Sequence, residues 1–224
     1  LKIVGGDSGK SEREEFRNSV ILSPSERYII EVLFDKAGEF DLIHTIPEED
    51  YVIGKVIVEE FAKKEIEFGR LKENVEIEKD INRLKNYFDK EPDFELELTV
   101  DMMGMGQMMH EMDMDANENI EWHDHMPQMN AMSNSKNIKW IIKDRKTGKE
   151  NMDIDYKANV GDVKKIRIFN NPDSMHPMHH PIHLHGHTFW LTGHEGARCP
   201  KSAWVPRNTE LIGIAQATDL EFIA

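Results

Sequence analysis

Hydrophobic residues recur along the first 60 residues in short runs typical of β-strands. The runs Tyr28–Phe34, Asp41–Ile46 and Tyr51–Val58 have strand length and are rich in β-branched and aromatic residues. A shorter run, Val20–Leu22, is followed by a Ser-Pro-Ser-Glu turn signal and is predicted to be a strand as well. Several short strands at this spacing predict a β-sandwich or a β-barrel.

The pattern changes between residues 61 and 91, where charged residues are dense. Ile81, Leu84 and Phe88 are spaced i, i+3 and i+7, as on one face of a helix. We therefore predict a charged linker with a short helix, which the Glu-Pro pair at positions 91 and 92 is expected to end.

Strand patterns return after residue 92. Phe94–Val100 alternates apolar and polar residues, which is typical of a half-buried strand. Further β-rich runs are Trp140–Ile142, Val163–Phe169, His183–Leu191 and Leu211–Ala215. The last residues, Asp219–Ala224, are also strand-like, and we interpret the chain as an internal piece of a longer protein rather than one ending on a docked strand.

Composition limits the classes of function. The chain has 28 basic and 42 acidic residues and a net charge of −14, which argues against nucleic acid or an anionic membrane as the main partner. A single cysteine, Cys199, excludes an intrachain disulfide and a Cys-based zinc finger. No run of 18 apolar residues predicts a membrane span. The unusual counts are 11 histidines and 13 methionines.

Seven of the 11 histidines lie between positions 176 and 194, most densely in the stretch HPIHLHGH that begins at His180. Because side chains at i and i+2 of a strand share a face, we expect His183, His185 and His187 to point the same way. His180 would face the opposite side. Imidazole suits Cu, Zn, Ni and Fe, so the spacing predicts two separate metal positions, and His187 is a candidate for orienting a ligand.

At these histidines the sequence resembles a known family. The motif HPIHLHGHTF, residues 180–189, resembles the third-domain copper motif of multicopper oxidases, the group of laccases and bacterial copper-efflux oxidases. The resemblance extends upstream through Val160–Asp162 and Ile166–Asn170. It covers the chain well from about Phe94 onward and covers the first 60 residues less specifically.

The resemblance implies an all-β fold of cupredoxin-like Greek-key β-sandwiches. Residues 1–60 would be the C-terminal part of a second cupredoxin-like domain, and residues 61–91 the charged linker with its short helix. Residues 92–224 would form a third, incomplete domain that carries a Met-rich insert at 102–132. The parent protein would bind copper in type 1, type 2 and type 3 centres.

The resemblance also implies a role for each histidine of the motif. His180 would ligate the type 1 copper, His183 the type 2 copper and His185 a type 3 copper, whereas His187 stands at a position that is not a ligand. The parent enzyme would take single electrons from Cu(I) or a phenol and reduce dioxygen to water at a trinuclear copper cluster. Its other implied partners are the missing domains of the parent chain, and its implied location is periplasmic or extracellular.

Two features of the family are absent from the sequence. The HxH pairs of the first domain and the closing HCHxxxH segment, which carries the type 1 thiolate, are not found. Cys199 has no flanking histidine and is interpreted as an incidental thiol. We expect a fragment truncated before the HCH motif to be inactive alone. We also expect it to fold poorly, because an unfinished sandwich leaves an open sheet edge and an exposed apolar face.

Ten of the 13 methionines lie between positions 102 and 132, among acidic residues and glycines that do not suit a packed helix. Thioether sulfur is a soft ligand that selects Cu(I), so we predict a surface segment that handles Cu(I) rather than a core element. The segment also resembles the Met-rich insert of copper-efflux oxidases. The candidate residues are Met102, Met103, Met105, Met108, Met109, Met112 and Met114.

Two other functions stay open from the sequence. One is a non-enzymatic periplasmic copper-binding or buffering protein that uses the Met-rich and His-rich segments. The other is a zinc hydrolase that uses the histidines. Copper-dependent oxidase turnover would distinguish the oxidase from both alternatives, and zinc in the purified protein without such turnover would favour the hydrolase.

Overall fold

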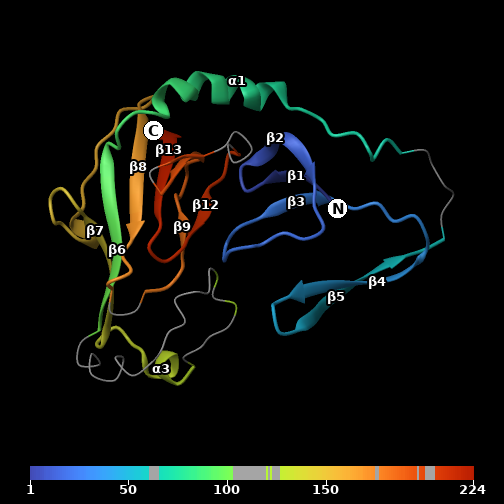
Figure 1. Cartoon of the computed structure of the whole chain (residues 1–224), viewed down its shortest axis with the longest axis horizontal. Coiled ribbons are helices and arrows are strands. Elements are labelled where there is room, and N and C mark those ends of the chain that lie inside the picture. Colours follow the sequence, from blue (N-terminus) through green and yellow to red (C-terminus); the bar gives the residue numbers. More distant parts are fainter. Residues whose placement is uncertain are drawn as a thin grey trace.

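The structure is a computed structural model, and it describes residues 1–60, 66–102, 120, 122, 127–174, 177–195, 197–199 and 205–224. Strands dominate these residues, and Figure 1 shows helix α1 (Val75–Leu84) along the top, between the N-terminal strands and the larger C-terminal sheet. Among the described helices, none combines the length and the hydropathy that crossing a membrane requires.

The N-terminal part begins with a small antiparallel sheet in the order β2-β1-β3. Its strands are β1 (Lys2–Gly6), β2 (Gly9–Phe16) and β3 (Tyr28–Glu31). The strand predicted at Val20–Leu22 is wrong, because this run has no regular secondary structure and its Ile21 and Leu22 side chains are exposed. An apolar run without a pairing strand gains neither ladder hydrogen bonds nor a covered face.

The next two predicted strands are confirmed and form a hairpin. β4 (Gly38–Thr45) pairs antiparallel with β5 (Asp50–Val58), and Thr45 lies opposite Asp50 next to the turn. Most side chains of both strands are exposed, so this hairpin lies apart from the main core.

Helix α1 begins at Val75, six residues before Ile81, the first residue of the predicted apolar repeat. The side chain of Asn74 caps it by accepting a hydrogen bond from the backbone N–H of Glu76 at 3.2 Å. The α-helix ends at Leu84, and the last part of the predicted helix is the 3₁₀ turn η1 (Lys85–Tyr87). Asn caps satisfy helix N–H groups that otherwise lack partners. The cap at Asn74 therefore explains why the helix begins earlier than its apolar repeat.

A six-stranded sheet forms the main layer, in the order β11-β10-β13-β8-β6-β7. Its strands are β6 (Phe94–Met102), β7 (Ile138–Asp144), β8 (Val163–Asn170), β10 (Phe189–His194), β11 (Ala197–Arg198) and β13 (Ala217–Ile223). β6 and β8 pair in parallel, and the other neighbours are antiparallel. The shorter elements are helix α3 (Pro127–Met132) and the 3₁₀ turn η2 (Asn151–Asp153).

The two faces of this sheet bury different clusters. One face contributes Ile166, Phe189 and Leu220 to a core that also includes Ile212 of the separate strand pair β9 (His180–His183) and β12 (Thr209–Ile212). The other face contributes Trp190 to a cluster with helix α1 and the adjoining Phe88. Alternate residues of a strand point to opposite faces, which explains the two clusters. The β9–β12 pair packed on the six-stranded sheet confirms the predicted all-β sandwich class.

A buried asparagine links the main sheet to the β9–β12 pair. Asn170, at the end of β8, is only 1% exposed. Its side-chain amide donates to the backbone oxygens of Met178 at 2.8 Å, Gly213 at 3.0 Å and Ile212 at 3.2 Å. These contacts hold the segment that leads into β9 and the end of β12 against the main sheet, because buried polar groups strongly favour such partners.

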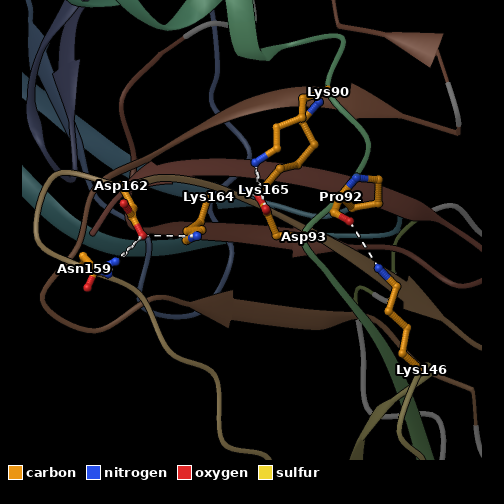
Figure 2. A network of polar contacts seen from close by, with 8 residues as sticks. All are labelled: Lys90, Pro92, Asp93, Lys146, Asn159, Asp162, Lys164 and Lys165. Carbon is orange, nitrogen blue, oxygen red and sulfur yellow. Dashed lines mark hydrogen bonds and ion pairs between the residues drawn. The ribbon is translucent and has the colours of Figure 1, made fainter.

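Polar contacts also fix the segment that joins α1 to β6 (Figure 2). Lys90 Nζ lies 2.7 Å from Asp93 Oδ1, and the backbone N–H of Lys165 donates to Asp93 Oδ2 at 2.9 Å. Lys146 Nζ donates to the backbone oxygen of Pro92 at 3.3 Å. Burial by itself raises the pKa of Asp93, but the hydrogen bonds from Lys90 and Lys165 lower it overall. The carboxylate therefore stays charged and ties the linker to β8.

Candidate metal centre

The central histidines lie on and just after the short strand β9. This strand pairs antiparallel with β12, and the register places Ile212 opposite His180 and Thr209 opposite His183. Leu184 extends the attachment, because its backbone N–H donates to the backbone oxygen of Asn208 at 3.0 Å. The backbone that carries the histidines is therefore fixed by β12, which in turn packs on the main core through Ile212.

His183 and His185 are neighbours in space. Their ring centroids are 5.7 Å apart, the planes meet at 60°, and both side chains are exposed. His183 Nδ1 lies 3.1 Å from the hydroxyl oxygen of Thr209, so its Nε2 is the nitrogen that remains for a ligand. Two adjacent imidazoles of this kind can supply part of a copper coordination shell.

His180 has different surroundings. Its side chain is half-buried, and its ring forms a T-shaped pair with Trp140 of β7, with the centroids 5.8 Å apart. Along β9, half-buried and exposed positions alternate, so His180 and Ile182 are half-buried whereas Pro181 and His183 are exposed. The neighbours of His180 thus differ from those of His183, as expected for residues three apart in a strand.

His187 does not continue the face of His183. The expectation of one strand that carries His183, His185 and His187 is wrong, because β9 ends at His183 and a turn follows. Gly186 has φ of +79°, a conformation that glycine adopts without strain and that breaks the strand. The His187 ring instead packs against Phe222 of β13, with the centroids 5.5 Å apart. Its role in orienting a ligand stays a prediction.

The methionine predictions fall mostly outside the described residues. Met102 is described, ends β6 opposite Ile138 and is only 2% exposed. The predicted surface location is therefore wrong for this residue, because Met102 continues the alternation of Phe94–Val100 and packs as a buried strand residue. Met103, Met105, Met108, Met109, Met112 and Met114 lie outside the described residues, as does His176.

The cysteine belongs to the core rather than to a metal site. Cys199 is 7% exposed and lies in the same buried cluster as Phe189 and Ile212. Burial raises the pKa of its thiol, which disfavours the thiolate form that binds metals.

On β12, Glu210 forms an ion pair with Arg207, and burial still raises the pKa of the Glu210 carboxyl group.

Sequence reasoning missed the residues that surround the histidines. Thr209 and Asn208 lie about 25 positions after His183, and Trp140 lies 40 positions before His180. No local motif marks them, because their contacts arise from strand pairing and sheet order. Among the described residues, no three His, Cys, Asp or Glu side chains form a group that could hold a metal ion.

Comparison with known proteins identifies the family. A sequence profile for multicopper oxidases matches residues 109–224, which is more than half of the chain. The chain belongs to the multicopper oxidase family. Copper is the cofactor that this family implies for the parent protein, and the exposed imidazole pair fits it, since imidazole is a common copper ligand. A comparison with curated proteins gave no significant match.

Solved structures support the same fold. A multicopper oxidase from Campylobacter jejuni, described as a metallo-oxidase, aligns with 99% of this chain at a TM-score of 0.62 and 19% identity. A laccase-like multicopper oxidase, CueO from Ochrobactrum sp., aligns with 99% at a TM-score of 0.58 and 20% identity. This multicopper oxidase chain spans 42% and 43% of those two chains. The predicted cupredoxin-like fold is confirmed.

Proposed function

We propose that this chain supplies His180 to an electron-entry copper and His183 with His185 to a separate trinuclear copper cluster of a multicopper oxidase. The observation that carries the proposal is the exposed pair of adjacent imidazoles, in which Thr209 occupies Nδ1 of His183. The different surroundings of His180, beside Trp140, support assigning it to a second copper.

Bound copper would supply one-electron transfer and the reduction of dioxygen to water. The residues of the chain would orient the imidazoles and control their environment. Thr209 holds one nitrogen of His183, and Trp140 lies in a T-shaped arrangement beside the half-buried His180 ring. An apolar neighbour of this kind limits water access and lowers the local dielectric constant, which tunes a redox site.

The reductant in this proposal is Cu(I) or a phenol. Soft thioether ligands favour Cu(I), and six candidate methionines follow the buried Met102 between positions 103 and 114. Replacing those six with serine is expected to slow Cu(I) oxidation more than phenol oxidation. Equal losses for both substrates would contradict Cu(I) handling by the segment. A periplasmic or extracellular location belongs to the same proposal.

We further propose that the remaining domains of the parent protein cover the N-terminal strands. Fourteen large hydrophobic residues among positions 1–60 are at least 41% exposed, and Ile57 of β5 reaches 70%. Apolar surface exposed to this extent usually marks a contact with another protein surface. The alignment with about two fifths of the length of larger multicopper oxidases supports further domains as the partner.

The test uses the whole protein after loading with copper. Copper content and dioxygen consumption are measured for the parent protein and for H183A, H185A and H44A. H183A and H185A are expected to lose bound copper and most dioxygen consumption, whereas H44A, a change in the exposed hairpin strand β4, is expected to retain both. Unchanged copper content in H183A and H185A would contradict the ligand assignment.

The same measurements separate the alternative functions. Bound copper without dioxygen consumption would favour a buffering protein. Tightly bound zinc, with no copper-dependent turnover, would favour a hydrolase. The proposed oxidase requires both copper and turnover, and both must depend on His183.

A further inference from the structure

Thr209 contacts His183 from a fully buried position. It is 0% exposed and begins β12, where the strand register places it directly opposite His183. Its hydroxyl oxygen lies 3.1 Å from Nδ1 of His183. A buried hydroxyl at this position has few possible partners, so this contact restricts the orientation of the imidazole ring.

The hydrogen-bond partners of Thr209 determine which atom donates. The Thr209 hydroxyl donates its single proton to Oδ1 of Asn208 at 3.0 Å. With that proton engaged, the same oxygen is left to accept, which favours a proton on Nδ1 of His183. A neutral imidazole that is protonated at Nδ1 has its lone pair on Nε2, the form that binds a metal through Nε2.

The backbone supports the same arrangement. The backbone oxygen of Asn208 accepts a hydrogen bond from the N–H of Leu184 at 3.0 Å, immediately after His183. Asn208 therefore contacts the histidine segment through its backbone, and its side-chain oxygen accepts the hydrogen bond of the Thr209 hydroxyl. The first contact holds the backbone next to His183, and the second holds the hydroxyl that faces its ring.

We propose that Thr209, with Asn208, is a positioning residue that holds His183 in the Nδ1–H tautomer and presents its Nε2 to copper. The inference rests on the proposed function, in which His183 is a copper ligand. Groups that orient metal-bound histidines typically change metal affinity by about 10–100-fold when they are removed. We expect a loss of that size when the Thr209 hydroxyl is removed.

The first test measures the tautomer of His183 in the whole, copper-free protein by long-range ¹H–¹⁵N NMR. The parent protein is expected to show Nδ1 protonated, and T209S, which keeps a hydroxyl, is expected to behave alike. T209V has a similar volume but no hydroxyl and is expected to shift His183 toward the Nε2–H form. The Nε2–H form in the parent protein, or no shift in T209V, would overturn the inference.

The second test measures copper affinity by competition with a chelator. T209V is expected to bind copper about 10–100-fold more weakly than the parent protein, and T209S is expected to recover most of the affinity. The control is T192V, which removes another buried hydroxyl, on β10, that donates to the backbone oxygen of Asp219 at 3.5 Å. An equal loss in T192V and T209V would overturn a specific role for Thr209.

The two tests distinguish failure of this inference from failure of the proposed function. If H183A binds copper as tightly as the parent protein, the proposed function fails. The tautomer measurement needs no copper, so it still decides whether Thr209 sets the protonated nitrogen. If H183A loses copper but T209V keeps both tautomer and affinity, only the positioning role is refuted.

Discussion

The hairpin β4–β5 and the six-stranded sheet have similar hydrophobic strand patterns but bury them differently. In the sheet, Phe189, Leu220 and Phe222 are at most 8% exposed, whereas Ile53 and Ile57 of the hairpin are 65% and 70% exposed. The pattern therefore predicts a strand in both regions, but it does not predict whether a second layer covers it. Burial depends on what packs against each face.

The second layers explain the difference. The β9–β12 pair covers one face of the six-stranded sheet, and helix α1 with the adjoining Phe88 packs on the other. The three-stranded N-terminal sheet instead has a buried ion-pair network. Lys2 is 2% exposed, and its Nζ lies 2.8 Å from Glu31 Oε2 and 3.2 Å from Glu14 Oε2. Within the described residues, Ile46 is the one buried hydrophobic residue of positions 1–60.

Exposed large hydrophobic residues are concentrated in the N-terminal part, where fourteen of them lie among positions 1–60. The last strand, β13, lies inside the six-stranded sheet between β10 and β8, and the edges of that sheet are β7 and β11. The expectation that the fragment folds poorly stays a prediction, and we expect it to apply mainly to the N-terminal part. The C-terminal sheet should be the more stable region of the chain.

The largest expected effect is in the core of the six-stranded sheet. L220A should lower the free energy of unfolding of that region by about 2–5 kcal/mol, because it leaves a cavity beside Ile166 and Phe189. I57A removes a side chain that is mostly solvated and should change it by less than about 0.5 kcal/mol. Urea unfolding measured by circular dichroism compares them, and equal losses would refute the contrast.

The next effect concerns the link between the main sheet and the histidine strand. N170A should cost about 1–3 kcal/mol, because it leaves the backbone oxygens of Met178, Ile212 and Gly213 without this donor. The less buried Asn171 side chain makes two hydrogen bonds, donating to Glu97 Oε1 at 2.9 Å and accepting from the backbone N–H of Asp173 at 2.8 Å, so N171A is a control with a smaller expected cost. Hydrogen exchange should show faster opening of β9 and β12 in N170A, and unchanged exchange there would contradict the link.

A smaller effect should appear as a dependence of stability on pH. Glu221 is fully buried beside Lys165 and Trp190, and its oxygens have no hydrogen-bond partner among the described residues. Burial raises the pKa of Glu221 to about 7, although Lys165 and Lys90 oppose the shift. As the pH rises from about 4.5 to 7, the unfolded state releases this proton while the folded state retains it. The full shift corresponds to about 3 kcal/mol, and solvent screening reduces the expected loss of stability to about 1–2 kcal/mol.

The variant E221Q tests this dependence because its amide does not ionise. Stability measured between pH 4.5 and 8 should decline less in E221Q than in the unsubstituted protein. E91Q, at an exposed position of the linker, is the control and should keep the decline. The same decline in E221Q and the parent protein would show that another group causes it.

The smallest effect on stability is expected in the hairpin. Replacing Ile53 and Ile57 with serine should change the free energy of unfolding by less than about 0.5 kcal/mol for each substitution. The same change should reduce binding of a hydrophobic dye such as ANS, because it removes exposed apolar area. Unchanged dye binding, together with a large loss of stability, would show that the hairpin side chains are buried in solution.

The sequence could predict much of the fold but little of the surroundings of the site. Alternation and β-rich runs located β4, β5, β6 and β8, and the apolar spacing of Ile81 and Leu84 located a helix. The start of that helix was missed, because the Asn74 cap lies before the apolar repeat. The run Val20–Leu22 has strand composition but no regular structure, since pairing rather than composition decides whether a strand forms.

For the candidate site, the sequence by itself determined the ligand chemistry, the histidine spacing and the resemblance to the multicopper oxidase family, because these are properties of neighbouring residues. Only the tertiary structure decided that β9 ends at His183, that Thr209 lies opposite it, that Trp140 meets His180 and that Met102 is buried. These features depend on strand register and sheet order, which join residues far apart in the chain and leave no local periodicity to read.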